Sequence, residues 1–270
     1  MEYLISPDEA LFNGRVKLYP DGQGGQIVHE VMVCSRAIFN PHGLERVGGR
    51  KKSSRITKEA REVWEAEEAG AASLERWEAE EKANRGRAKR RARQRVYDLA
   101  ACNRFDLFVT LTLDRQKCDR YDYKAVVRKL GQWLDNRVRR AGLRYLMVPE
   151  FHKDGAVHFH GLINSEAVKL LDSGRRYKDG RVIYNLPEWS LGFTTAIPLA
   201  GDYSAVCAYI CKYITKQGEA VGGRYYLSGG KLEEPVLQYF NADFEAAEGE
   251  AFEIPAGGIC FKVTNPADFF

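Results

Sequence analysis

The stretch after Asn103 alternates short apolar segments with amphipathic ones, and this order limits the folds open to the chain. The segment "FDLFVTLTLD" predicts a buried strand at about 107–113, because it is rich in aromatic and β-branched residues. Within 121–142, apolar residues at spacings of three and four predict an amphipathic helix that ends at Gly142. Further strands are predicted in "LRYLMVPEF", "VHFHGLIN" and "LGFTTAIPL", and a helix in "DYSAVCAYICKYITK". Hairpins that alternate with helices indicate an α+β fold with a central antiparallel sheet flanked by helices.

Composition divides the chain into four parts. Residues 1–55 mix short apolar runs with turn-rich pieces, which predicts short strands and loops. Residues 56–99 are rich in Glu, Ala, Arg and Lys and predict a charged helical extension. Residues 100–235 form the compact region described above, and 236–270 are a tail without a usable periodicity. At 270 residues the chain is long enough for one main domain with extensions.

The charges of the helical extension change sign along its length. Nine glutamates lie between Glu59 and Glu81, whereas residues 82–95 are strongly basic. Two compatible interpretations stay open: a solvated helix with internal ion pairs, or an arm that binds a nucleic-acid backbone. The basic residues that would contact DNA in the second case are Arg87, Lys89, Arg90, Arg91, Arg93 and Arg95.

The six cysteines have neither the paired spacing of zinc ribbons nor the density of disulfide scaffolds. We therefore expect reduced thiols in a cytosol. The start of the chain, "MEYLISPDEALFNGRV", contains acidic residues and no long apolar run. The sequence thus predicts neither a signal peptide nor a membrane helix, and a cytoplasmic protein of a bacterial cell.

The two histidines of "VHFHGLI", His158 and His160, are two residues apart in a predicted strand, so both side chains leave the same face of the sheet. A His-x-His pair on a strand can be coincidental, but two imidazoles held in this way can also share one cation. Glu150 on the preceding strand lies opposite His158 if the hairpin loop has three residues, and faces away if it has two. Gly155 sits where a three-residue loop needs a positive φ, which favours the first register.

Two imidazoles and one carboxylate with open positions suit a divalent ion that also holds a substrate oxygen. We expect Mg²⁺ or Mn²⁺ for a phosphate substrate, with Zn²⁺ as an alternative. His152 would fall on the same face and is a candidate fourth ligand or phosphate contact.

The segment "YICKYITK" repeats a tyrosine and a lysine one helical turn apart. At about 100° per residue, Tyr209, Lys212, Tyr213 and Lys216 form one stripe, and apolar residues occupy the opposite side. Such stripes are usually packing or solvated surface. Beside a metal-bound phosphate, however, a phenol with a neighbouring ammonium can act as a nucleophile and leave a covalent phosphotyrosine.

Three motifs, in this order, resemble those of the HUH endonucleases, specifically the rolling-circle replication initiators of phages and plasmids with two active-site tyrosines. "FVTLTLD" is similar to the first motif of that family, "HFHGLI" to its His-hydrophobic-His motif, and "YICKYITK" to its two-tyrosine motif. The resemblance covers about 100–235 and implies a sheet with helices similar to the RNA-recognition fold.

The resemblance also implies roles for the candidate residues. His158, His160 and Glu150 would be metal ligands, and Tyr209 and Tyr213 alternating nucleophiles. Lys212 and Lys216 would assist phenolate formation or hold the scissile phosphate. The implied partners are single-stranded DNA at a replication origin and, because the sequence has no P-loop motif, a host helicase as well as a polymerase.

Two alternatives stay open. A relaxase or transposase of the same superfamily would share the catalytic core, although relaxases usually place their tyrosine before the histidines and transposases usually have one tyrosine. A non-catalytic nucleic-acid-binding module on a degenerate nuclease scaffold would retain aromatic and arginine side chains for stacking and phosphate contact.

Overall fold

The structure, a computed structural model, describes residues 11–39, 41, 70–216, 219–254 and 258–263. The chain forms two compact units, the first made of Met1–Glu80 and Pro235–Phe270 and the second of Glu81–Glu234. Each unit contains one antiparallel sheet, and the described residues include three α-helices. These elements confirm the predicted α+β class.

The second unit is built on a seven-stranded sheet with the strand order β6-β7-β8-β3-β5-β4-β9, in which every pair is antiparallel. Its strands are β3 (Leu107–Leu113), β4 (Tyr145–Phe151), β5 (Val157–Ile163), β6 (Leu171–Arg176), β7 (Val182–Asn185), β8 (Gly192–Pro198) and β9 (Leu227–Gly229). The central strand β3 lies between β5 and β8. Its alternating burial separates a face of Val and Leu from a face that carries Thr110 and Thr112.

Helix α3 (Tyr123–Ala141) covers the Val and Leu face of this sheet. Its buried residues, among them Leu130 and Leu134, pack with Leu111 and Phe159 in one core cluster. The side chain of Asp122 caps the first turn by accepting from the Ala125 amide at 3.0 Å. Gly142, with φ 68°, ends the helix in the left-handed conformation, as the sequence predicts.

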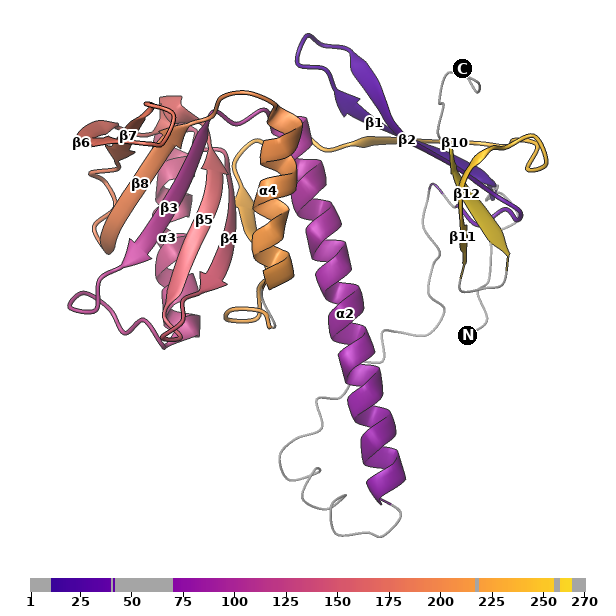
Figure 1. The fold of residues 1–270 in the computed structure, drawn as a ribbon, viewed down its shortest axis with the longest axis horizontal. Coiled ribbons are helices and arrows are strands. Elements are labelled where there is room, and N and C mark those ends of the chain that lie inside the picture. The colour runs from indigo at the N-terminus through magenta and orange to yellow at the C-terminus, as the bar shows by residue number, and fades with distance from the viewer. Residues whose placement is uncertain (1–10, 40, 42–69, 217–218, 255–257, 264–270) are drawn as a thin grey trace. The chain divides into compact units, whose positions relative to one another are not determined.

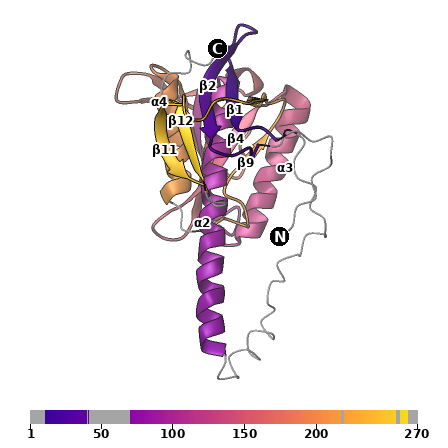
Figure 2. The same cartoon turned by 90° about the vertical axis from the view of Figure 1, so that its right-hand side faces the viewer.

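Helices α2 (Gly70–Asn103) and α4 (Tyr203–Lys216) lie on the opposite face of the sheet (Figure 1). Figure 2 shows α3 and α4 on opposite sides, with β4 and β9 between them. Val96 and Leu99 of α2 share a core cluster with Ile210 and Ile214 of α4. The charged segment predicted over 56–99 is described from residue 70 onward, where α2 continues to Asn103; residues 56–69 lie outside the described residues. None of the helices in the described part combines the length and apolar composition that a bilayer span requires.

The loop expected between "VHFHGLIN" and "LGFTTAIPL" contains a hairpin, β6–β7. The turn between its strands closes with hydrogen bonds between Tyr177 and Arg181 and between Gly180 and Tyr177. Gly180 adopts a φ of 88°, which a side chain would disfavour. The hairpin extends the sheet beyond β8, to which β7 pairs through Tyr184 and Ala196.

The first unit joins both ends of the described chain in a five-stranded sheet with the order β10-β1-β2-β12-β11. Its strands are β1 (Gly14–Pro20), β2 (Gln26–Cys34), β10 (Val236–Phe240), β11 (Gly249–Glu253) and β12 (Ile259–Val263). Val16, Val31 and Val33 are among its most buried residues. The tail, which has no usable periodicity in sequence, thus forms strands by pairing with β1 and β2.

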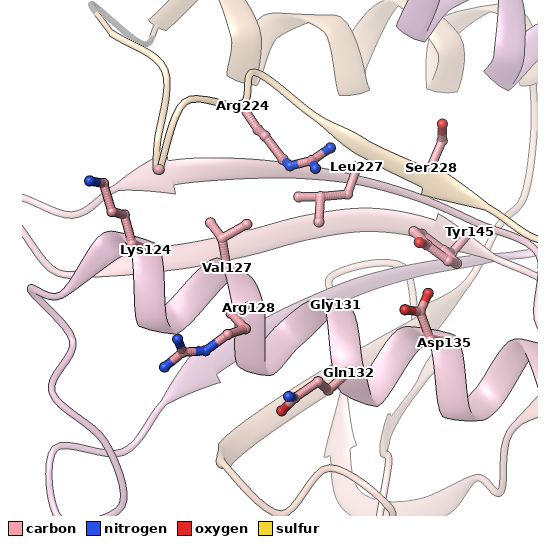
Figure 3. A pocket seen from close by; sticks show the side chains of 11 residues that line it. Lys124, Val127, Arg128, Gly131, Gln132, Asp135, Tyr145, Arg224, Leu227 and Ser228 are labelled. Atoms are coloured by element: carbon pink, nitrogen blue, oxygen red, sulfur yellow. The ribbon is translucent and has the colours of Figure 1, made fainter.

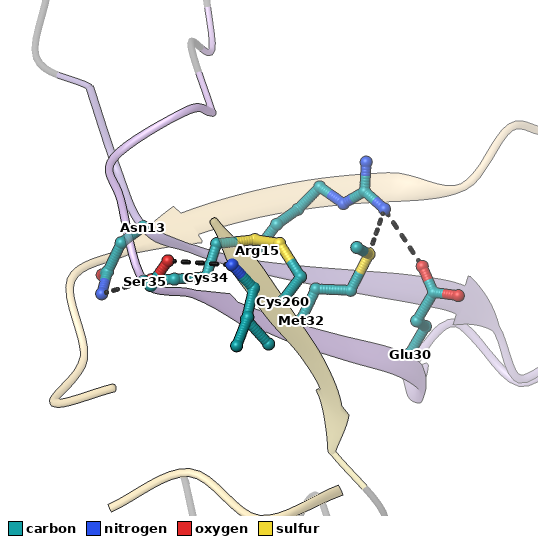
Figure 4. The surroundings of a disulfide bond; sticks show 8 residues. Asn13, Arg15, Glu30, Met32, Cys34, Ser35 and Cys260 are labelled. Atoms are coloured by element: carbon teal, nitrogen blue, oxygen red, sulfur yellow. Dashed lines mark hydrogen bonds and ion pairs between the residues drawn. A yellow bond between two sulfur atoms is a disulfide. The ribbon is translucent and has the colours of Figure 1, made fainter. Parts of the chain in front are cut away.

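A disulfide joins Cys34 of β2 to Cys260 of β12 (Figure 4), so the expectation of six reduced thiols is wrong for this pair. The two residues are direct partners in the antiparallel register, their Cα atoms are 3.9 Å apart, and both are fully buried. The remaining cysteines are free and buried: Cys102, Cys118, Cys207 and Cys211. Burial raises the pKa of Cys207 to about 12 and that of Cys211 to about 11, so both thiols are poor nucleophiles at neutral pH.

The disulfide predicts a defined thiol count. Alkylation in denaturant should modify the four free cysteines of the untreated protein and all six after reduction, as measured by intact mass. Because the bond spans 226 residues, its reduction should lower the free energy of unfolding of the first unit by up to about 5 kcal/mol. Six modified thiols without reduction would contradict the bond.

Candidate active site

The hairpin of β4 and β5 places the candidate ligands on one face of the sheet. Glu150 pairs directly with His158, which confirms the register expected for a three-residue loop. The loop closes through the amide of His152 on the carbonyl of Ala156 at 2.7 Å, and Gly155 has a φ of 83°. The carboxylate nevertheless reaches diagonally: Glu150 Oε2 lies 2.7 Å from His160 Nε2.

Two threonines of β3 orient the imidazoles. Thr110 Oγ1 lies 3.1 Å from His160 Nδ1, and Thr112 Oγ1 lies 3.2 Å from His158 Nδ1. Both threonines are direct register partners of these histidines. A hydroxyl can donate or accept, so each threonine can hold its imidazole in either tautomer. Each Nε2 can therefore carry a proton or offer a lone pair without loss of the bond at Nδ1.

Burial lowers the pKa of both His158 and His160, and the neighbouring Glu150 offsets this effect only in part. Neutral imidazoles are the form that binds a metal ion. Among the described residues, no three His, Cys, Asp or Glu groups already stand together as a ligand set. Here Glu150 is hydrogen-bonded to His160, and an ion would have to replace that bond. The donor set, two threonine-oriented imidazoles and a carboxylate, fits a divalent ion.

His152, the candidate fourth ligand, lies at the exposed end of this row. Its ring stacks on His158 with the centroids 5.0 Å apart. Its Nδ1 is 3.4 Å from Asp154 Oδ1 in the loop. His152 therefore extends the imidazole face toward solvent.

The two tyrosines of α4 reach the same face but differ in exposure. Tyr213 is buried, with 6% of its surface exposed, and its ring stacks on His160 with the centroids 4.0 Å apart and 16° between the planes. Tyr209 is 45% exposed. The Tyr213 hydroxyl donates to the Tyr209 oxygen at 2.8 Å, so the phenols are directly connected.

The environment of Tyr213 opposes its ionisation. Burial raises the pKa of Tyr213 well above its usual value, and the hydrogen bond to Tyr209 adds to the shift. The sequence predicts that neighbouring ammonium groups favour phenolate, but at Tyr213 the balance is the reverse. The two phenols of the repeat are thus chemically unequal.

The lysines accompany the tyrosines along the helix. Lys212 Nζ lies 5.8 Å from the centre of the Tyr209 ring, and Lys216 Nζ lies 5.6 Å from that of Tyr213. Lys216 Nζ is also 3.5 Å from Glu150 Oε1. Helix α4 therefore brings all four residues of the repeat to the face that carries the histidines.

The basic block on α2 divides into structural and exposed side chains. Lys89 Nζ donates to the Thr215 carbonyl at 2.9 Å, and Arg95 forms an ion pair with Glu234 that raises the pKa of the guanidinium. Arg87 donates to Asn84 on the same helix. The remaining candidates are exposed: Arg90, Arg91 and Arg93.

Arg90 and Arg93 line a pocket of about 360 Å³ between α2 and α4, next to Ala208. Ala208 precedes Tyr209, so basic side chains of α2 approach the exposed phenol from one side. A second pocket, of about 550 Å³, lies between α3 and β9 (Figure 3). Its basic residues Lys124, Arg128 and Arg224 point in different directions and do not converge on one ligand position.

Sequence analysis missed several residues of the site. Thr110 and Thr112 could have been found from the period-two pattern of "FVTLTL", which places both on the face opposite Val109 and Leu111. Phe108 follows the same alternation, and its ring centre lies 6.1 Å from that of His160 and 5.6 Å from that of Tyr209. Only the tertiary structure brings these strands and α4 together.

The model of one protein family, that of the replication-associated protein ORF2, matches residues 106–218. The match begins just before β3 and ends just after α4, so it contains Glu150, both histidines of the pair and both tyrosines. No curated protein and no solved structure matches the chain. The family match supports a role of this protein as a replication initiator.

Proposed function

We propose that the protein is a metal-dependent, site-specific endonuclease and strand transferase of the HUH type, which nicks and rejoins single-stranded DNA to start rolling-circle replication of a phage or plasmid. The contact that supports this most directly is the stacking of Tyr213 on His160, because it brings the phenols of α4 to the imidazole pair of β5. The family match supports the replication role independently.

Tyr209 is the first nucleophile in this proposal. Its side chain is exposed to a strand in solution, and its oxygen accepts the hydrogen bond from Tyr213. A hydrogen bond received by the oxygen stabilises the phenolate, as does the ammonium of Lys212 above the ring. Tyr213 begins as the donor and is held neutral by burial.

In the first transfer, the Tyr209 oxygen forms a bond to phosphorus and the bond from phosphorus to the 3′ oxygen breaks. The phenol proton passes to solvent, and the leaving 3′ oxygen takes up a proton as a free hydroxyl. The 5′ end stays on Tyr209 as a phosphodiester. An esterified oxygen is a poor acceptor, so the Tyr213 hydroxyl loses its partner and becomes available for a second transfer.

The ligand set and the lysines neutralise the charge of the phosphate. When bound by Glu150, His158 and His160, Mg²⁺ or Mn²⁺ would polarise the phosphodiester. Lys216, now near Glu150, would be free to approach the phosphate once the carboxylate serves the ion. The exposed arginines of α2 would add salt-sensitive affinity for the backbone of the strand.

The first prediction concerns the order of the tyrosines. With Mn²⁺ and a single-stranded oligonucleotide pool, Tyr209→Phe should abolish the covalent adduct on denaturing gels. Tyr213→Phe should keep the adduct within about tenfold of the wild-type rate, because only a hydrogen bond to Tyr209 is lost, but should lack the second transfer. Tyr121→Phe, an exposed tyrosine outside this site, is the control. An adduct that depends on Tyr213 alone would reverse the order, and none in the wild type would favour a non-catalytic module.

The second prediction separates chemistry from binding. His158→Ala, or chelation of divalent ions by EDTA, should lower the cleavage rate by about 100-fold or more. The affinity for the same oligonucleotide, measured by fluorescence anisotropy, should stay nearly unchanged, because backbone contacts dominate binding. An equal collapse of affinity would show that the histidine holds DNA and not an ion.

The third prediction concerns the exposed arginines. Replacing Arg90 and Arg93 by alanine should weaken binding to single-stranded DNA and reduce the slope of log K against log salt by about 0.7 for each lost phosphate contact. Arg140→Ala, an exposed arginine on α3, is the matched control and should leave the slope unchanged. A slope identical to that of the wild type in the double variant would remove these arginines from the interface.

A further inference from the structure

A pocket of about 520 Å³ adjoins the tyrosines on the side away from α2. It lies between β3, β8, α4 and the turn after β6, and it includes Phe108, Tyr177, Arg181, Ile197, Val206 and Tyr209 in its walls. Its volume falls within the range of about 300–1,000 Å³ that is typical of small-ligand sites. At its inner end, His160 and Tyr213 line the same space, so a ligand there would lie beside the proposed chemistry.

One wall is a preorganised pair of flat side chains on the β6–β7 turn. The guanidinium of Arg181 lies 5.3 Å from the centre of the Tyr177 ring. Arg181 Nε donates to Asp179 Oδ2 at 2.8 Å, and a further hydrogen bond runs from its guanidinium to the Pro198 carbonyl. Arg181 is thus held in place from two sides, whereas Tyr177 is 43% exposed and accessible to a ligand.

The other walls offer little hydrogen-bonding capacity. Phe108, Ile197 and Val206 are apolar, and the hydroxyl of Thr110 already binds His160. The carboxylate of Asp202 accepts from the amide and the hydroxyl of Ser204 at 2.9 and 2.7 Å. The pocket therefore favours a flat, largely apolar group that stacks on aromatic rings.

Resting on the function proposed above, we infer that this pocket holds the base of a nucleotide adjacent to the phosphate that Tyr209 attacks. A strand whose phosphate lies at Tyr209 has bases within reach of the pocket, and stacking on aromatic and arginine side chains is how proteins hold single-stranded bases. Because every base has a π-face, the pocket recognises the presence of a base more than its identity. It positions the strand and fixes which phosphate meets the phenol.

The experiment uses the full chain and an oligonucleotide selected from a randomised single-stranded pool for adduct formation with Mn²⁺. An abasic nucleotide is placed at each position flanking the cleaved phosphate in turn. We expect one position at which the loss of the base slows adduct formation by about 5- to 100-fold, the range for one stacked base. Tyr177→Ala and Ala205→Trp, which open and fill the pocket, should cause a similar loss with the intact base and no further loss with the abasic one.

Tyr121→Ala is the matched control, because Tyr121 is also an exposed tyrosine with an arginine over its ring, at 5.8 Å, but lies outside this pocket. It should keep the full abasic effect, and thermal melts should confirm that all variants fold. The inference is overturned if no flanking position responds to base loss, or if the response persists undiminished in both pocket variants.

A wild-type protein that forms no adduct would instead contradict the proposed function. The pocket is then decided by a single-stranded oligonucleotide that carries one 2-aminopurine base. Stacking should quench its fluorescence in the wild type and in Tyr121→Ala, and less in Tyr177→Ala. Equal quenching in all three proteins would overturn the inference.

Discussion

The stacking of Tyr213 on His160 is the contact on which the candidate site depends, because it joins the helix of the phenols to the hairpin of the imidazoles. The apolar side of α4 makes this contact possible. Ile210 and Ile214 are fully buried in the cluster that α4 shares with α2 and the sheet, and Tyr213 belongs to the same cluster. The helix therefore cannot turn about its axis without exposing this core.

Burial also divides the two tyrosines into different roles. A helical repeat supplies two equivalent phenols, but the sheet lies against only one side of α4. Tyr213, nearer to the sheet, is buried and donates its proton toward Tyr209, whose exposed oxygen accepts it. The geometry thus provides one phenol that a strand can reach and a second that becomes available when the first is esterified.

The surroundings of Tyr209 give a single strand a path across α4. On one side lie the exposed arginines of α2, and on the other the aromatic pocket against β8 and the β6–β7 turn. Positive charge suits the continuous backbone, whereas flat apolar walls suit individual bases. Every side chain of this path and of the candidate site belongs to the second unit. The first unit unites the two ends of the described chain through its sheet and its disulfide.

The sequence by itself determined features that depend on local rules. Alternation and helical spacing predicted the α+β class, Gly142 the end of α3, and Gly155 the register that places Glu150 opposite His158. Contacts between distant segments were decided only by the tertiary structure. Cys34 and Cys260 are 226 residues apart, the tail strands form only against β1 and β2, and the spacing of Tyr209 and Tyr213 does not reveal which phenol is buried. Local backbone preferences act within a few residues, whereas burial and pairing depend on which segments the fold brings together.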